Sequence, residues 1–371
     1  MSSFRAILDD PGDFIAALPA MLGFVPERSL LVAVLKGSAC HPPADTASVF
    51  AVLRFDLDQP DDLVGDPVEH FAGAIARICA FVDSTEVLAV IVDDRVTLPA
   101  SPRGDADGGA HAALITALDH RLVDAGIGLV GAWVTAAIES DQPWSTLLGH
   151  PDHGLLPDPT ASTVTVAVTA KGEPIFASRS ELVSLVEPDQ QTMEQVDRLL
   201  PSARSTIRRR YAARRRGGDP DGATRRELER ALGLIAAFDS GCLPTVSQTA
   251  QVAAALADRR VRNGLLATAL SIYARSAESL WSHLTRTLPS PERAEAATLL
   301  AYSAYVRGNG PLAGIALQTA LDADPYHHLA VLLEAALEMG LDPVSMRRLG
   351  RSGAEIVRGL GIEIELPDAS S

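Results

Sequence analysis

Residues 86–95 read EVLAVIVDDR, and this stretch decides how the first half of the chain folds. Its unbroken apolar run at 87–92 predicts a strand over 86–92 that is covered on both faces. Two further runs, SLLVAVLK at 29–36 and SVFAVLRFDL at 48–57, are bounded by Gly, Pro and Asp and predict two more strands. These runs indicate a sheet that helices cover in layers.

Helical patterns alternate with these strands. Asp-Pro at 66–67 begins one amphipathic helix, a second covers about 111–125, and GLVGAWVTA at 128–136 predicts the next strand. A helix at about 11–22 is expected to be shortened or kinked by Pro19. Because strands alternate with helices, we predict an α/β domain over residues 1–188 with a mostly parallel layered sheet.

Two segments of this half have weaker patterns. Residues 139–160 are rich in Pro and Gly and predict a loop. For residues 160–170 a strand and a short helix both stay open, because β-branched residues favour the first while Asp158-Pro159 and Gly172 favour the second.

The chain beyond Pro188 has helical periodicity almost throughout. Its Gly and Pro breaks predict six to eight helices of about 10–25 residues, and therefore an all-helical domain over 189–371. Within it, residues 297–325 carry the small and large positions of a tetratricopeptide unit, with the closing Ala320-x4-Pro325. A weaker match at Leu266, Ala267 and Pro291 lies 34 residues earlier. We therefore expect helical hairpins of tetratricopeptide-like geometry.

Length and composition set the class of protein. The 371 residues exceed the roughly 250–300 at which one hydrophobic core stops growing, so two domains are expected. The apolar runs are shorter than the roughly 18–20 residues of a membrane span, and the N-terminus has no signal-peptide core. Three dispersed cysteines make no disulfide framework. These features predict a soluble cytoplasmic protein that does not associate with membranes.

The net charge of −15 is unevenly distributed. Residues 1–170 hold 23 acidic and 8 basic residues, whereas the remainder holds 24 of each. Eleven arginines lie between 198 and 230, and a helix there would place Arg204, Arg208 and Arg215 on one side, with Arg209 beside them. The acidic total disfavours a nucleic-acid partner. We expect these arginines to pair with the acidic N-terminal domain, in the same chain or in a second copy, although nucleic-acid binding and a solvated face stay open.

Charged and aromatic residues mark candidate ligand sites. Asp93 and Asp94 follow the most apolar strand, where open α/β sheets bind ligands, and Asp56 and Asp58 follow the second strand in the same way. Glu27 and Arg28 precede the first strand and could line a site. Trp144, in the Pro-rich segment, could pack on the sheet or stack on a ligand.

Three further features concern anions, metals and cofactors. Arg179 could clamp an anion, although an ion pair at a helix start explains it as well. His150 and His153 are weak metal candidates, because a polar loop is the more common setting for such a pair. The sequence has no HExxH, GxxxxGK[ST], GxSxG or GxGxxG after a strand, so no metal and no cofactor is predicted.

Several motifs together resemble an actinobacterial family known as domain of unknown function 4192. They lie at 10–19 (DPGDFIAALP), 22–29 (LGFVPERS), 54–56 (RFD), 144–145 (WS), 178–182 (SRSEL), 307–310 (RGNG) and 324–325 (DP). The first motif is the most specific, and the set spans nearly the whole chain. The resemblance implies a cytosolic actinobacterial protein for which the family supplies no activity.

These observations favour a non-catalytic module that binds a ligand or a protein, with a protein partner or a second copy of the chain as possible partners. One alternative is an enzyme, hydrolase-like or metal-assisted, with its site at the carboxyl ends of the strands. Another is nucleic-acid binding through the arginine-rich helix. The sequence does not decide whether the protein is an enzyme.

Overall fold

The computed structural model describes residues 10–36, 48–58, 66–96, 109–170 and 172–366. Its contacts divide the chain into two compact units. The α/β unit ends at Leu182 and also includes residues 338–340, and the helical unit comprises the chain from Val183 onward apart from those three residues. The boundary expected at residue 188 lies a short distance further along the chain.

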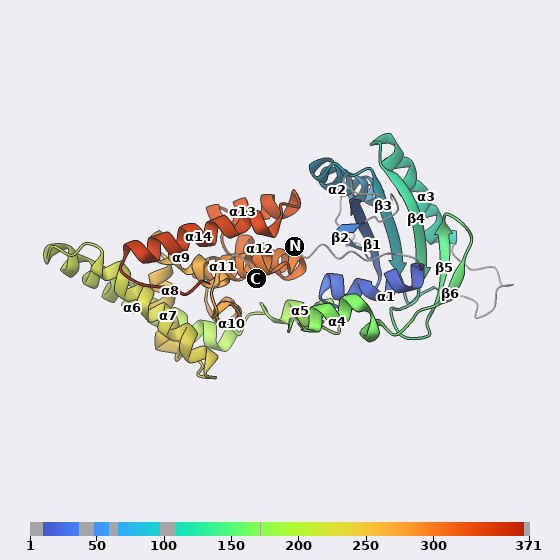
Figure 1. Ribbon diagram of the computed structural model, residues 1–371. Coiled ribbons are helices and arrows are strands. Elements are labelled where there is room, and N and C mark those ends of the chain that lie inside the picture. Colours follow the sequence, from blue (N-terminus) through green and yellow to red (C-terminus); the bar gives the residue numbers. More distant parts are fainter. Residues whose placement is uncertain (1–9, 37–47, 59–65, 97–108, 171, 367–371) are drawn as a thin grey trace. The chain divides into compact units, whose positions relative to one another are not determined.

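Six strands form one sheet in the order β2-β1-β3-β4-β5-β6 (Figure 1). The strands are β1 (Ser29–Lys36), β2 (Ser48–Asp56), β3 (Glu86–Val92), β4 (Gly128–Thr135), β5 (Pro143–Leu148) and β6 (His153–Leu155). β3 and β4 pair in parallel, and the other four pairs of this described sheet are antiparallel. The prediction of a mostly parallel sheet is therefore wrong. Alternation of strands and helices gives their order along the chain, but not the direction in which each strand enters the sheet.

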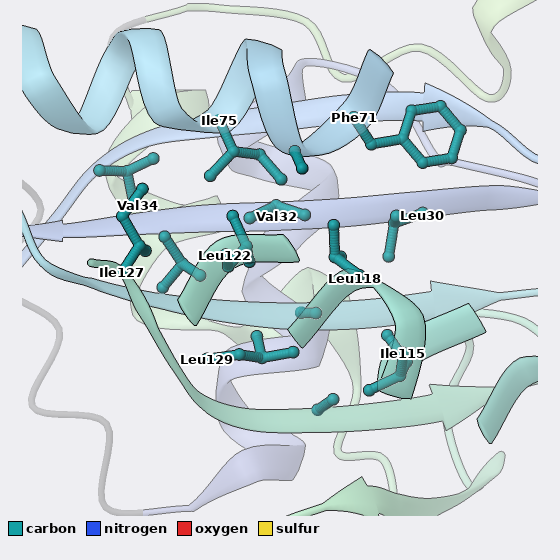
Figure 2. Packing of buried hydrophobic residues seen from close by; sticks show 14 of the residues in the cluster. Leu30, Val32, Val34, Phe71, Ile75, Ile115, Leu118, Leu122, Ile127 and Leu129 are labelled. Carbon is teal, nitrogen blue, oxygen red and sulfur yellow. The ribbon is translucent and has the colours of Figure 1, made fainter. Parts of the chain in front are cut away.

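Two helices cover one face of the sheet. Residues of α2 (Pro67–Val82) and α3 (Gly109–Asp124) point onto the central strands (Figure 2). The contacting side chains include Phe71, Ile75, Ile115, Leu118 and Leu122 from the helices, and Leu30, Val32, Val34 and Leu129 from the strands. This is the amphipathic packing that the spacing of apolar residues predicts, and it fixes where α3 begins relative to the end of β3.

Helix α1 (Pro11–Leu22) covers the opposite face. Its Phe14 ring lies edge-on to Trp133, with 6.1 Å between ring centroids. Ala132 and Val134, on either side of Trp133 in β4, belong to the core under α2 and α3, so Trp133 and α1 lie on the other face. Pro19 does not shorten this helix, because α1 continues to Leu22. Gly23 then ends it with φ 78° and donates its N–H to the Pro19 carbonyl.

The segment 139–160, predicted as a loop, instead contains the hairpin of β5 and β6. Proline begins β5, a position at which a strand tolerates its missing N–H. For residues 160–170, the helix and not the strand is correct. The segment forms a short 3-10 helix, η1 (Pro159–Ala161), followed by helix α4 (Thr163–Ala170). A further short helix, α5 (Arg179–Ser184), follows the isolated bridge between Phe24 and Phe176.

The helical unit contains nine α-helices and one 3-10 helix in its described part. They are α6 (Gln190–Arg216), α7 (Gly222–Asp239), α8 (Val246–Leu256), α9 (Arg259–Leu265), η2 (Leu266–Leu270), α10 (Ala274–Thr287), α11 (Glu292–Arg307), α12 (Gly310–Ala323), α13 (His328–Glu338) and α14 (Pro343–Gly359). Seven of these described α-helices have 10–25 residues, which confirms the predicted six to eight of that length; α6 is longer, with 27 residues, and α9 is shorter, with 7. The break at Asp258, which caps α9 through its side chain, contains neither Gly nor Pro and so escapes a search for helix breakers.

The predicted tetratricopeptide-like segment forms a helical hairpin. α11 and α12 pack together through small residues such as Ala304, Ala313 and Ala320, all buried, and Gly308 ends α11 with φ 91°. The weaker match 34 residues earlier is wrong as a second hairpin of this kind. In such a repeat, Leu266 and Ala267 would lie in an α-helix that packs on the next helix. They lie instead in the 3-10 helix η2.

Candidate functional site

A cluster of charged side chains lies at the edge of the sheet where β3 ends. β1 runs antiparallel to both neighbours, so its first residue lies opposite the last residues of β2 and β3, with Ser29 opposite Asp56 and Val92. The residues that flank these strand ends therefore meet at one edge. The cluster consists of Arg28, Asp58, Asp93, Asp94, Arg95 and His111. We call it the edge cluster.

Asp93 is the buried centre of the edge cluster, with 1% of its side chain exposed. Arg95 donates from Nε to Oδ1 at 2.8 Å and from Nη2 to Oδ2 at 2.9 Å, and its backbone N–H reaches Oδ1 at 3.1 Å. His111, in the first turn of α3, approaches Oδ2 with Nε2 at 2.8 Å. Burial opposes ionisation of Asp93, but the hydrogen bonds from Arg95 and His111 outweigh it and hold the pKa of the carboxyl below its ordinary value.

Arg28 joins two more carboxylates to the edge cluster. Its Nε and Nη2 donate to the two oxygens of Asp94 at 2.8 and 3.1 Å, and its Nη1 donates to Asp58 at 3.3 Å. The hydrogen bond from Arg28 lowers the pKa of Asp94, and the bonds from Asp94 and Asp58 raise the pKa of Arg28. These pairs are exposed, so each contributes little to folding stability.

The backbone at Arg28 adopts φ 42°, the left-handed region that a residue with a Cβ rarely occupies. The Arg28 carbonyl accepts a hydrogen bond from Leu57 at 2.9 Å, and the Ser29 hydroxyl donates to the Glu27 carbonyl at 2.6 Å. These bonds hold the turn ahead of β1. Strained positions of this kind are concentrated at functional sites.

Two arginines of the edge cluster converge on a single exposed carboxylate. Arg28 reaches Oδ2 of Asp58, and Arg95 Nη1 reaches Oδ1 of the same residue at 2.8 Å. The side chains of Asp58, Arg28 and Arg95 are 44%, 47% and 52% exposed. The geometry is that of two guanidinium groups holding an anion at a solvent-accessible edge, with Asp58 supplying the anion from within the chain.

Residues 11–344 match the model of a family described as Domain of unknown function (DUF4192). The chain belongs to this family. The match covers the α/β unit and the helical unit as far as residue 344. No curated protein and no solved structure matches the chain.

In this DUF4192 chain, three of the residues predicted to bind a ligand come together: Arg28, Asp93 and Asp94. Glu27 lies next to Arg28 with its side chain exposed. The edge cluster also contains Asp58, which the acids after the second predicted strand made a candidate, and Arg95 and His111, which were not predicted to bind a ligand. The pairing of His111 with Asp93 depends on how α3 packs on the sheet.

Trp144 and Arg179 lie outside the edge cluster. Trp144 is 4% exposed and packs on the α1 side of the sheet, where a Cβ on Gly154 would lie 2.9 Å from the indole nitrogen. Arg179 begins α5 near Arg54 and Asp56. Partial burial and the neighbouring charge of Arg54 lower its pKa, while Asp56 acts in the opposite direction.

The two weak metal candidates lie on the β5–β6 hairpin. His150 is exposed in the turn and His153 begins β6, opposite Ser145. Within the described ranges, no group of three or more His, Cys, Asp or Glu side chains is arranged to hold a metal ion. Across the same ranges, no helix is both long and apolar enough to cross a membrane.

The arginine-rich segment forms α6, and part of it is paired within the helical unit. Arg204 bonds to Glu292, Arg210 Nη1 lies 3.2 Å from Glu227, and Arg214 lies 3.5 Å from Asp219. The side chains of Arg208, Arg209 and Arg215 are exposed. The partners observed are acids of the helical unit itself, and pairing with the acidic half of the chain or with a second copy stays a prediction.

Proposed function

We propose that this protein is a ligand-binding protein whose α/β unit binds a small anion at the edge cluster. The observation that carries the proposal is the convergence of Arg28 and Arg95 on the single exposed carboxylate of Asp58. Guanidinium groups recognise carboxylate and phosphate oxygens through the same planar donors. A ligand that supplies those oxygens would replace Asp58.

The energetics favour such an exchange. An exposed ion pair contributes only about 0–1 kcal/mol, so releasing Asp58 from the two arginines costs little. Asp93 keeps Arg95 in place through two further hydrogen bonds, so that guanidinium stays positioned when Asp58 leaves. The first turn of α3, which carries His111, adds the positive end of a 16-residue helix to the same edge.

The location also supports ligand binding. The edge cluster follows β3, and β3, α3 and β4 form the parallel strand–helix–strand unit of this sheet. In α/β folds, ligands bind outside the carboxyl ends of parallel strands, because the loops there can vary without disturbing the core.

The test is a calorimetric titration of the full chain with inorganic phosphate and, separately, with acetate, at constant ionic strength. Arg28→Ala and Arg95→Ala are expected to weaken binding at least tenfold, since each removes one guanidinium. Asp58→Asn is expected to strengthen binding several-fold, because it removes the competing carboxylate.

Two control variants separate site binding from general charge effects. Arg77→Ala removes an exposed arginine of α2, and Glu69→Gln removes an exposed acid of the same helix. Equal changes in the controls and in the edge-cluster variants would contradict the proposal, as would the absence of anion binding by the Asp58→Asn protein.

A second candidate function concerns the helical unit, for which we propose tetratricopeptide-like protein binding. The α11–α12 hairpin, with its small interhelix residues, supports it. An enzymatic role and nucleic-acid binding through α6 stay predictions, as do the actinobacterial origin and the cytoplasmic location.

A further inference from the structure

A cavity of about 350 Å³ lies in the helical unit, and all of its lining residues belong to α7 and α8. Its apolar wall is formed by Leu234 and Ala237 of α7 and by Val252 and Ala255 of α8. On α7 the lining residues extend from Glu227 to Ala237, which is about 15 Å along an α-helix. A cavity of this length and volume is narrow, and it suits a chain-like ligand better than a compact one.

The polar part of the lining has an excess of positive charge. Glu227, with 2% of its side chain exposed, accepts from Arg230 Nη1 at 2.6 Å and from Arg210 Nη1 at 3.2 Å. One carboxylate is therefore shared by two guanidinium groups, and one positive charge is left over. Glu227 and Arg230 both line the cavity, so a bound monoanion would balance this charge.

Arg230 has hydrogen-bond donors left for such an anion. Its Nη1 bonds to Glu227, while its Nε and Nη2 have no partner among the residues that the structure describes. Nε and Nη2 are the same two groups with which Arg28 holds both carboxylate oxygens of Asp94 in the α/β unit. This pair of parallel donors matches the geometry of a carboxylate.

Gly233 of α7 leaves room at the cavity. It belongs to the lining, and a Cβ built on it would meet no heavy atom within 4 Å. Its φ is not positive, so the backbone of α7 does not require glycine at this position. A larger side chain there would enter open space without displacing its neighbours, and it would narrow the cavity.

We propose that this cavity binds a monocarboxylate with an unbranched apolar chain, the chemistry of a medium-chain fatty acid. The carboxylate accepts from Nε and Nη2 of Arg230, whose Nη1 stays bonded to Glu227. The chain packs on the apolar wall that contains Leu234 and Val252. The site shares no residue with the edge cluster, so this inference is independent of the anion binding proposed there.

The experiment is a calorimetric titration of the full chain with octanoate, butyrate and 1-octanol, with inorganic phosphate in excess to occupy the edge cluster. Octanoate is expected to bind at least tenfold more tightly than butyrate, because each buried methylene adds a factor of about four. It is expected to bind at least tenfold more tightly than 1-octanol, which lacks the charged acceptor. Arg230→Gln should weaken octanoate binding at least tenfold, and Gly233→Leu should abolish it by filling the cavity.

The matched controls are Arg226→Gln and Ala236→Leu, two exposed positions of α7 that do not line the cavity, and both are expected to keep full affinity for octanoate. If Arg230→Gln does not fold, Gly233→Leu carries the comparison, since it leaves the ion pairs of Glu227 in place. The inference is overturned if octanoate does not bind the unmodified chain, if 1-octanol binds as tightly, or if Gly233→Leu has no effect. Displacement of octanoate by phosphate would place it at the edge cluster and would also overturn the inference.

Discussion

The edge cluster and the ion pairs between α6 and α7 are built from the same residue types, arginine and carboxylate, but they differ in how exposed their members are. In the helical unit, Glu227 is 2% exposed and lies between Arg210 and Arg230, with N–O distances of 3.2 and 2.6 Å. Its partners come from α6 and from its own helix, so the buried charge joins two packed helices. In the α/β unit, Asp93 is equally buried, but the outer pairs around it are exposed and come from the ends of three strands.

The difference shows what each network can do. A buried carboxylate with both partners on rigid helices cannot exchange a partner without unfolding its surroundings, so it contributes to stability and specificity of packing. Exposed pairs around a buried anchor can exchange with solvent anions at small cost. The edge cluster therefore combines a fixed centre with replaceable outer partners, which is the arrangement a binding site needs.

The largest expected effect is in the helical unit. Glu227→Ala leaves Arg210 and Arg230 without their common partner, and the free energy of unfolding is expected to fall by about 3 kcal/mol. Urea denaturation measures it. Glu229→Ala, an exposed position on the same helix, is expected to change stability by less than about 0.5 kcal/mol. If both variants lose a similar free energy of unfolding, the buried ion pairs of Glu227 do not stabilise the helical unit.

A smaller loss is expected from Asp93→Asn in the edge cluster, about 2 kcal/mol at neutral pH, because Arg95 and His111 lose a charged acceptor. The pKa of Asp93 is lower in the folded chain than the ordinary value of about 4, so its contribution is complete at pH 7. That contribution declines as the pH falls below about 4. The gap between the two proteins should therefore narrow in acid.

Urea denaturation at pH 7 and at about pH 3 tests this sign. The control is Asp94→Asn, whose pair with Arg28 is exposed and screened by solvent, so its loss at pH 7 is expected to be clearly smaller than that of Asp93→Asn. A gap that widens in acid would show that Asp93 is not held ionised by its partners.

The smallest effect concerns the backbone at Arg28. Arg28→Ala and Arg28→Gly both remove the ion pairs, but only glycine relieves the positive φ of 42°. The glycine variant is expected to be more stable than the alanine variant by about 0.5–1 kcal/mol. Thermal unfolding of the two proteins, compared side by side, measures the difference. If the alanine variant is the more stable, the turn carries no strain.

The sequence predicted much of the α/β unit from particular residues. The runs at 29–36, 48–57 and 86–92 are strands, and the Asp-Pro pair at 66–67 begins α2. Strand direction was not predictable, because β1 has antiparallel neighbours on both sides and only long-range pairing determines that. The hairpin of β5 and β6 was missed because its Pro and Gly residues also occur in loops.

The candidate site was predicted only in part. Arg28, Asp93 and Asp94 are visible in the sequence as charges at predicted strand ends. His111 looks like an ordinary polar residue at the start of a helix, and its role appears only when α3 packs and brings it to Asp93. Trp144 stands out in the sequence as a tryptophan in a segment rich in Pro and Gly, but its side chain is buried in the α/β unit.

By itself, the sequence determined local structure: where apolar runs make strands, where periodicity makes helices, and that the acidic excess lies in the first half of the chain. Those properties depend on residues close together along the chain. Only the tertiary structure decided the strand order, the burial of Asp93, and the meeting of Arg28 with Asp94, 66 residues away. Such contacts depend on how helices and strands pack, and packing is a property of the whole fold.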